Sequence, residues 1–380
     1  KGKALIDKYI TLESDWFTSF VQEGFQTFYD AESQSWLGKF FNESIDIESS
    51  PLKLNLVSNH NQVWTNSDVN LVDIGDGILK LSFQTKMNVM GGGVMDGIAE
   101  SISIAESHFE GIVIANEGDN FSLGANLVIP YMLACDKDWE QLDMLIQQFQ
   151  QIMLKVRYAN IPIVVAPHGM ALGGACELML QASAVQATPE LYTGLVEFGV
   201  GLIPAGGGTK EMARRISERS IAGDVELNML QRVYMNIATA KVSGSAFEAV
   251  DLYYIKNGAP ISMNRANQIT DAKDLAKLMA KGGYVAPQPT PIKVQGKTGL
   301  AGLYVAAHQM LEGGFITAHD KLIAEKLAYV ICGGALSAPQ NVSEQYLLDL
   351  EREAFLSLLG EHKTLERINA VLTGKKVVRN

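Results

Sequence analysis

Two glutamates twenty residues apart, each beside a glycine-rich turn, are the residues best suited to chemistry in this chain. Glu177 ends the segment HGMALGGACE (168–177), and Glu197 lies within GLVEFGVGLIPAGGGT (194–209). A third glycine turn, GDNFSLGANL, covers residues 118–127. Paired carboxylates can transfer protons, and the backbone N–H groups of sharp turns can hold an oxyanion. This set suits chemistry on a thioester that passes through an enolate.

The glycines at 173 and 174 come just before a helical run. The first N–H groups of a helix have no intrahelical acceptor, and the helix dipole adds positive charge there. We therefore expect the Gly174 N–H to stabilise an oxyanion, a contribution of about 3 kcal/mol in acyl chemistry. The alternatives are a helix start that needs small residues for packing, and a Glu177 that only stabilises that helix start.

Glu197 lies among apolar residues, in the segment LVEFGV (195–200). A buried carboxyl group has a raised pKa and can act as an acid near neutral pH. The alternative is an ion pair with Lys210, Arg214 or Arg215.

The elements around these motifs alternate between strands, glycine turns and helices. A strand at 111–116 runs into the first turn, and a strand at 163–166 runs into the second. The spacing of apolar residues predicts helices, and the Asp-Gly pair at 76–77 predicts a hairpin. The helices are expected at 94–105, 142–153 and 347–358, and the hairpin over 71–83. The pattern indicates an α/β protein with its site at the strand ends.

Other reactive residue types give weaker signals. His168 is a possible base, but a histidine without a nucleophile beside it is usually structural. The three cysteines, Cys135, Cys176 and Cys332, are widely spaced, as expected of reduced cysteines. No His, Asp or Glu set has metal-ligand spacing, so we expect no metal. No segment has the pattern of a nucleotide-binding loop, so we expect no dinucleotide site.

The length, composition and charge of the chain limit the classes of protein to which it can belong. The 380 residues are enough for two or three domains, and 47% of them are hydrophobic. The net charge of −11 disfavours nucleic acid as a partner. No apolar run reaches the ~20 residues that a membrane helix needs. The chain starts with Lys1 and shows no signal-peptide pattern, so we expect a cytoplasmic protein that is a piece of a longer one.

From about Val72 to Gly283, the residues of these motifs and their order along the chain resemble those of the crotonase (enoyl-CoA hydratase/isomerase) superfamily. The resemblance assigns catalysis to Glu177 and Glu197, and an oxyanion hole to the N–H groups of Leu123 and Gly174. It also assigns substrate contacts to Lys86, Asn88, Phe121, Gly124, Ala125, Asn126 and Gly173. The chain departs from the family pattern at Asn126, Ala175 and Val196, which leaves the acyl chain length open.

The resemblance also implies an architecture, the crotonase-type α/β superhelix of ββα units with additional C-terminal helices. The C-terminal region, including residues 344–355, resembles bacterial proteins that fuse a 3-hydroxyacyl-CoA dehydrogenase to a crotonase domain. We therefore expect residues 1–55 to be the helical tail of a dehydrogenase domain plus a linker. Residues 56–290 would be the crotonase core, and 291–380 a C-terminal helical region.

The activity implied is enoyl-CoA hydratase activity in fatty-acid β-oxidation, with an acyl-CoA as substrate and no cofactor. The implied partners are copies of the chain, as a trimer or hexamer, and a dehydrogenase domain of the same parent chain. Two alternatives stay open. One is a 3-enoyl to 2-enoyl-CoA isomerase, and the other is a non-catalytic assembly domain.

Overall fold

The computed structural model describes residues 29–30, 35–40, 43–46, 61–220, 226–376 and 378–380. The chain divides into two compact units, Lys1–Val57 and Ser58–Asn380. In the first unit, three strands form an antiparallel sheet in the order β1-β2-β3. These strands are β1 (Tyr29–Asp30), β2 (Ser35–Phe40) and β3 (Glu43–Asp46).

The expectation that the region before the linker, residues 1 to about 45, is helical is wrong over these strands. The segment SWLGKF combines aromatic residues, which favour strands, with a glycine, which disfavours a helix. Residues 1–28 of the expected helical tail lie outside the described residues.

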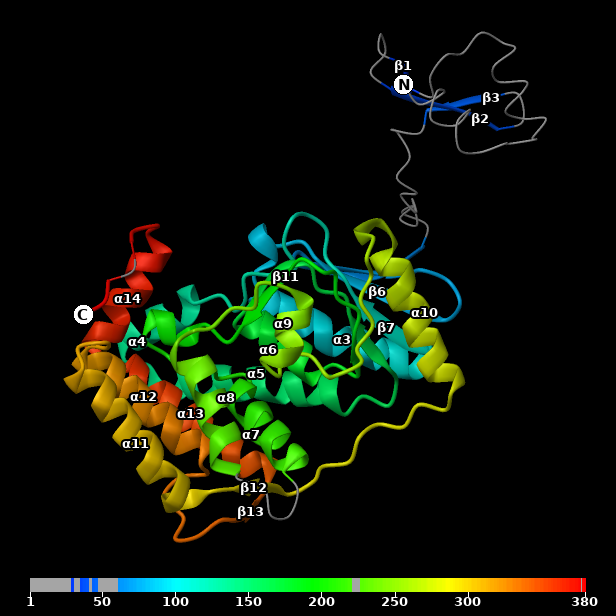
Figure 1. Ribbon diagram of the computed structural model, residues 1–380. Coiled ribbons are helices and arrows are strands. Elements are labelled where there is room, and N and C mark those ends of the chain that lie inside the picture. Colours follow the sequence, from blue (N-terminus) through cyan, green and yellow to red (C-terminus); the bar gives the residue numbers. More distant parts are fainter. Residues whose placement is uncertain (1–28, 31–34, 41–42, 47–60, 221–225, 377) are drawn as a thin grey trace, which may run out of the picture. The chain divides into compact units, whose positions relative to one another are not determined.

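A six-stranded sheet is the centre of the second unit, with the order β10-β8-β7-β6-β5-β4 (Figure 1). Strands β4 to β6 are antiparallel neighbours, and β6, β7, β8 and β10 are parallel neighbours. Their bounds are β4 Gln62–Thr65, β5 Val69–Asp73, β6 Ile78–Phe83, β7 Gly111–Ile114, β8 Ile163–Val165 and β10 Ala184–Val185. The predicted hairpin is confirmed as β5 and β6, with left-handed backbone at Asp76 and Gly77 in its turn.

Helices cover both faces of this sheet, as is usual where parallel strands are buried. On one face, Leu79 and Leu81 pack into the main core with α3 (Gly92–His108), α5 (Trp139–Arg157) and α6 (Gly174–Gln181). On the other face, Ile78 and its neighbours pack against α10 (Gln268–Lys281). Figure 1 shows α10 beside β6 and β7. The predicted strands and helices that flank the glycine turns are therefore confirmed.

A second, smaller sheet carries the site. It pairs β9 (Gly169–Leu172) with β11 (Leu191–Gly194) in parallel. The remaining elements, in chain order, are η2 Lys86–Asn88, α4 Val128–Asp136, η3 Glu197–Val200, α7 Gly208–Arg219, α8 Glu226–Ala238, α9 Ala246–Asp251, η4 Arg265–Asn267, β12 Ile292–Val294, α11 Gly296–Glu312, α12 Ala318–Ile331, β13 Gln340–Val342, α13 Glu344–Leu359 and α14 His362–Leu372.

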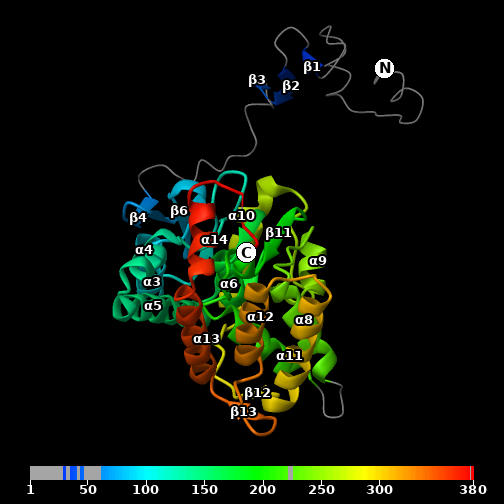
Figure 2. The same cartoon turned by 90° about the vertical axis from the view of Figure 1, so that its left-hand side faces the viewer.

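The C-terminal helices share the core of the residues before them. Leu347, Phe355 and Leu358 of α13 are buried in the same hydrophobic cluster as Leu178 of α6. In Figure 2, α12 lies between α13 and α8, and α12 contacts α13, α7 and α8. The structure thus places both sides of residue 290 in one compact unit. The apolar face of the predicted last amphipathic helix packs within the chain.

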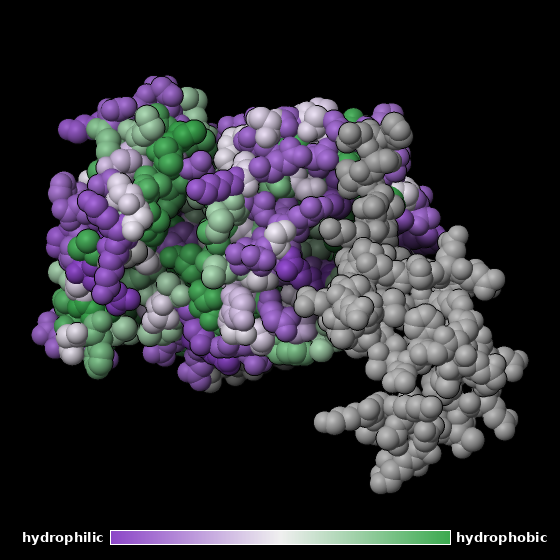
Figure 3. Space-filling model, turned by 90° about the horizontal axis from the view of Figure 1, so that it is seen from above, coloured by the Kyte–Doolittle hydropathy of each residue, from purple (hydrophilic) through white to green (hydrophobic). Residues whose placement is uncertain are grey.

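One face of the second unit carries a group of exposed apolar residues. Seen from above, apolar residues gather on the side of the second unit where α4 and α14 lie (Figure 3). Exposed apolar side chains there include Val128, Ile129 and Met132 of α4, and Val371 and Leu372 of α14. Among the described residues, no helix is long and apolar enough to cross a membrane.

Candidate active site

The two glycine turns meet although about fifty residues separate them in the sequence. Ser122 pairs with Ala171 as a parallel bridge, and the Leu172 N–H donates to the Ser122 carbonyl at 3.1 Å. A Cβ atom added to Gly124 would lie 2.5 Å from the Leu172 carbonyl oxygen and 3.2 Å from the Gly174 nitrogen. Gly124 also has φ +96°, so both its space and its backbone angle require glycine.

The predicted oxyanion donors lie at this junction. Gly174 is the first residue of α6, and its N–H has no hydrogen-bond acceptor among the described residues. The Leu123 N–H donates to the Met87 carbonyl at 3.4 Å, which is long for a hydrogen bond between these atoms. The site therefore offers one free backbone donor and one that is only weakly engaged.

Glu177 lies in the first turn of α6, directly after the second glycine turn, and is 2% exposed. Its Oε1 atom accepts hydrogen bonds from the Gly206 and Gly208 N–H groups, both at 2.8 Å. Burial raises the pKa of Glu177 to about 7, although these two N–H groups and Lys210 favour the ionised form. Near neutral pH this carboxyl group can therefore lose its proton and serve as a base.

Glu197 begins η3, beside the second turn. Its Oε1 atom lies 3.2 Å from where a Cβ atom of Gly173 would be. Its Oε2 atom is inaccessible to solvent and has no hydrogen-bond partner among the described residues. Burial, followed by the negative charge of Glu177, raises the pKa of Glu197 well above its usual range. The raised pKa favours the protonated form of Glu197, so this carboxyl group can serve as an acid.

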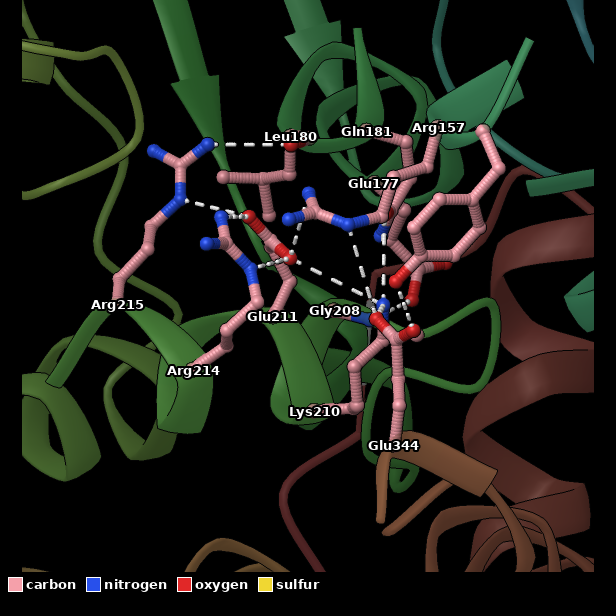
Figure 4. A network of polar contacts seen from close by, with 12 residues as sticks. Arg157, Glu177, Leu180, Gln181, Gly208, Lys210, Glu211, Arg214, Arg215 and Glu344 are labelled. Atoms are coloured by element: carbon pink, nitrogen blue, oxygen red, sulfur yellow. Dashed lines mark hydrogen bonds and ion pairs between the residues drawn. The ribbon is translucent and has the colours of Figure 1, made fainter. Parts of the chain in front are cut away.

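The ion pair considered as an alternative role for Glu197 is not formed. Lys210 pairs with Glu344, with 2.7 Å between Nζ and Oε1, and Arg215 pairs with Glu211, with 3.1 Å between Nε and Oε1. Arg214 also pairs with Glu211. Figure 4 shows this buried network, in which the three cations face carboxylates other than Glu197. Glu197 thus remains unpaired beside the glycine turn.

The other predicted site residues have varied surroundings. Phe121 is fully buried, and its ring centroid lies 6.3 Å from that of Phe83. The Asn88 side chain donates to the carbonyls of Glu117 and Asn120, so it supports the first turn. Lys86, Ala125 and Asn126 are exposed, and the Asn126 Oδ1 atom accepts the Val128 N–H at the start of α4.

His168 has a structural contact rather than a catalytic one. Its Nε2 atom lies 3.1 Å from the Gly118 carbonyl, at the entrance of the first turn. Burial lowers its pKa. Among the described residues, no group of three His, Cys, Asp or Glu side chains could hold a metal ion.

Sequence reasoning missed one carboxylate near the site. Glu351 of α13 is fully buried and accepts hydrogen bonds from the Gly207 and Lys210 N–H groups. The signal was available, because Glu351 falls on the same helical face as Leu347, Ala354 and Leu358. An ionisable residue on an apolar face needs a partner, and here the partners are backbone N–H groups.

The sequence matches a known family. Residues 73–232 match the family model described as enoyl-CoA hydratase/isomerase. A "Probable 3-hydroxyacyl-CoA dehydrogenase" of Bacillus subtilis (strain 168) is 38% identical over 368 residues, 96% of this chain and 46% of the relative. A "Putative fatty acid oxidation complex trifunctional enzyme" of Rickettsia prowazekii (strain Madrid E) is 27% identical over 330 residues, 87% of this chain and 42% of the relative. The chain thus spans less than half the length of these relatives.

Solved structures share the fold. An enoyl-CoA hydratase from Rhodobacter sphaeroides 2.4.1 has a TM-score of 0.58 at 17% identity, covering 83% of this chain and 92% of that chain. An enoyl-CoA hydratase from Bacillus halodurans has a TM-score of 0.54 at 17% identity, and the match covers 80% of this chain and 100% of that chain. The family match, the shared fold and the paired glutamates agree: residues 73–232 match the crotonase (enoyl-CoA hydratase/isomerase) superfamily, and the chain has the fold of solved enoyl-CoA hydratases.

Proposed function

We propose that this chain is an enoyl-CoA hydratase that adds water to trans-2-enoyl-CoA thioesters in fatty-acid β-oxidation. The observation that carries the proposal is the pair of buried carboxyl groups beside the turn that presents the Gly174 N–H. Burial raises the pKa of Glu177 to about 7, and burial and the negative charge of Glu177 raise the pKa of Glu197 well above its usual range. A base and an acid at one site are what the addition of water requires.

The proposed steps use these groups in order. The thioester oxygen accepts hydrogen bonds from Gly174 and Leu123, with the latter N–H leaving its long contact to Met87. Glu177 takes a proton from water while the water oxygen bonds to C3, and the C2–C3 π electrons move toward the thioester as an enolate. Glu197 then gives its proton to C2. The product is a 3-hydroxyacyl-CoA, and one proton must return from Glu177 to Glu197 before the next turnover.

The thioester accepts the electrons in this scheme, so the scheme uses only protein groups, backbone donors and water. The proposed contacts to the rest of the substrate involve Lys86 and Asn88, beside the first turn, and the backbone of Gly124 and Gly173. The names of the relatives support fatty-acid oxidation as the pathway and a dehydrogenase region of the same parent chain as a partner. We propose that the chain works in the cytoplasm.

A comparison of two substrates tests this function. Hydration of crotonyl-CoA removes the conjugated double bond, so the ultraviolet absorbance of the enoyl thioester should fall when the protein is added. A 3-enoyl-CoA, which an isomerase would convert, should give no comparable gain of conjugated thioester. Conversion of the 3-enoyl-CoA without hydration of crotonyl-CoA would favour the isomerase. No turnover of either substrate would favour the non-catalytic assembly domain.

A further inference from the structure

The loop before α7 is held by two carboxylates from different parts of the chain. The N–H groups of Gly206 and Gly208 donate to Glu177, each at 2.8 Å. The N–H groups of Gly207 and Lys210 donate to Glu351, at 2.6 and 3.0 Å. The N–H groups of residues 206 to 208 therefore alternate between Glu177 of α6 and Glu351 of α13, and Lys210, in the first turn of α7, gives Glu351 a second donor.

The loop leaves little room for Glu177 to move. A Cβ atom on Gly206 would lie 2.8 Å from the Glu177 Oε2 atom and 2.3 Å from Cε1 of Phe149, and one on Gly208 would lie 2.9 Å from the Glu177 Oε1 atom. The backbone thus packs directly on the carboxyl group of the proposed base. A shift of this loop would move Glu177 with it.

Glu351 makes contacts of a different kind from its buried neighbours. Both its oxygens accept backbone N–H groups, Oε1 from Gly207 and Oε2 from Lys210. Glu344, the other buried glutamate of α13, instead accepts hydrogen bonds from side chains, the Lys210 ammonium group and the Tyr158 hydroxyl. Glu351 is therefore the residue of this helix that fixes the loop backbone.

We infer that Glu351 is a positioning residue, through which the C-terminal helix α13 holds the 206–208 loop and, with it, Glu177 in the geometry for proton transfer. This inference rests on the proposed function, because it assigns Glu351 an effect on the step that Glu177 performs. It also gives the C-terminal helices a part in catalysis beyond packing.

The test combines kinetics with a double-mutant cycle on the full chain. Glu351→Ala removes both acceptors, and Glu351→Gln keeps the shape but can accept only one of the two N–H groups. Misplacing a catalytic group by about 1 Å can cost about 10²-fold, so we expect kcat to fall about 10²-fold in Glu351→Ala and about 10-fold in Glu351→Gln. KM for crotonyl-CoA should change less than about 3-fold, because the loop acts on chemistry rather than on binding.

Two comparisons distinguish an effect of Glu351 on the position of Glu177 from a general loss of folded structure. Added to Glu177→Gln, the Glu351 substitutions should lower kcat no more than about 2-fold further, because the group that Glu351 positions is already removed. Glu344→Gln, on the same helix, should lower the melting temperature but leave kcat within about 3-fold of wild type, since it leaves the loop N–H groups bonded.

Several results would overturn the inference. One is a folded Glu351→Ala, or Glu351→Gln if the alanine variant does not fold, with kcat within about 2-fold of wild type. Another is an equal loss in the wild-type and Glu177→Gln backgrounds. If wild-type protein is active and Glu177→Gln is not, these failures concern Glu351 alone. An inactive wild type would instead reject the proposed function, and this inference with it.

Discussion

At the scale of single residues, two glutamates in one site differ because their contacts differ. The Glu177 carboxyl group accepts two backbone N–H groups, whereas the Glu197 Oε2 atom has no partner among the described residues. Hydrogen bonds to the charged form favour ionisation, and burial without them opposes it. The same residue type therefore supplies both a base and an acid.

The pH dependence of hydration follows from this difference. Activity requires Glu177 ionised and Glu197 protonated, so kcat/KM should rise as pH increases through about 7, where Glu177 titrates. It should fall again at higher pH, where Glu197 loses its proton. The profile is measured with crotonyl-CoA from pH 5 to 10 or so. A flat profile from pH 5 to 8 would contradict the assignment of Glu177 as the base.

The stability of the protein should depend on pH for the same reason. A carboxyl group with a raised folded pKa stabilises the fold fully below its unfolded pKa, and this stabilisation is lost as pH rises through the folded value. For Glu177 the loss falls between about 4.5 and about 7. Glu177→Gln cannot ionise, so its melting temperature should exceed that of wild type by a few degrees at pH 8 and by less at pH 5.

Glu211 provides the matched control for this measurement. Burial alone would raise the pKa of Glu211, but hydrogen bonding from Arg214 and the charges of Arg215 and Lys210 hold it well below its usual range. Its stabilisation is therefore present at neutral pH and lost as the pH falls. Glu211→Gln should lower the melting temperature most at pH 8. A difference for Glu177→Gln that is the same at both pH values would refute the prediction.

The sequence was informative about residues whose partners are nearby in the chain. Glu177 and the glycines before it share one turn, so the type and order of residues indicated a helix start with a carboxylate. Glu351 was missed because its partners are the backbone N–H groups of Gly207 and Lys210, more than a hundred residues away. A sequence pattern shows that such a glutamate is buried, but not which donors it meets.

At the scale of elements, the site depends on contact between two glycine turns. Gly124→Ala would place a Cβ atom 2.5 Å from the Leu172 carbonyl oxygen, at a backbone angle that alanine rarely adopts. The turns would have to separate, moving both Leu123 and Gly174. Loss of one oxyanion donor costs about 10²–10³-fold in kcat, and we expect a loss in this range.

Gly302→Ala is the control for that substitution. Gly302 lies in α11, and no atom lies within 4 Å of its added Cβ atom. Alanine is also the better helix former, so activity should be unchanged and stability equal or slightly higher. Equal activity of the Gly124 and Gly302 variants would show that the junction of the turns is not needed.

The strands and helices that flank the turns were predicted because their apolar residues form continuous runs or helical spacing, whereas the short strands β9 and β11 were not predicted. The strands before both turns and the helices after them are confirmed as β7, β8, α5 and α6. The first unit was predicted as helix over positions where the structure has strands, because a cluster of aromatic residues has no unique period. Which face of an aromatic segment is buried depends on partners that the sequence does not reveal.

At the scale of the whole molecule, we predict that the isolated chain forms a trimer or a hexamer. The apolar face of α13 packs within the chain. Exposed apolar residues instead gather near α4 and α14, and such patches often mark interfaces. Light scattering at micromolar concentration should give three or six times the chain mass of 41.3 kDa. A strictly monomeric species would contradict the prediction.

The direct test of the account is the rate of crotonyl-CoA hydration by wild type and two variants. Glu177→Gln and Glu197→Gln keep the size of each side chain but remove its proton transfer, which contributes about 10²–10⁴-fold. We predict that wild type hydrates the substrate and that each variant, still folded by circular dichroism, loses at least about 10²-fold in kcat. A folded variant that keeps more than about half of the wild-type rate would contradict the role assigned to that glutamate.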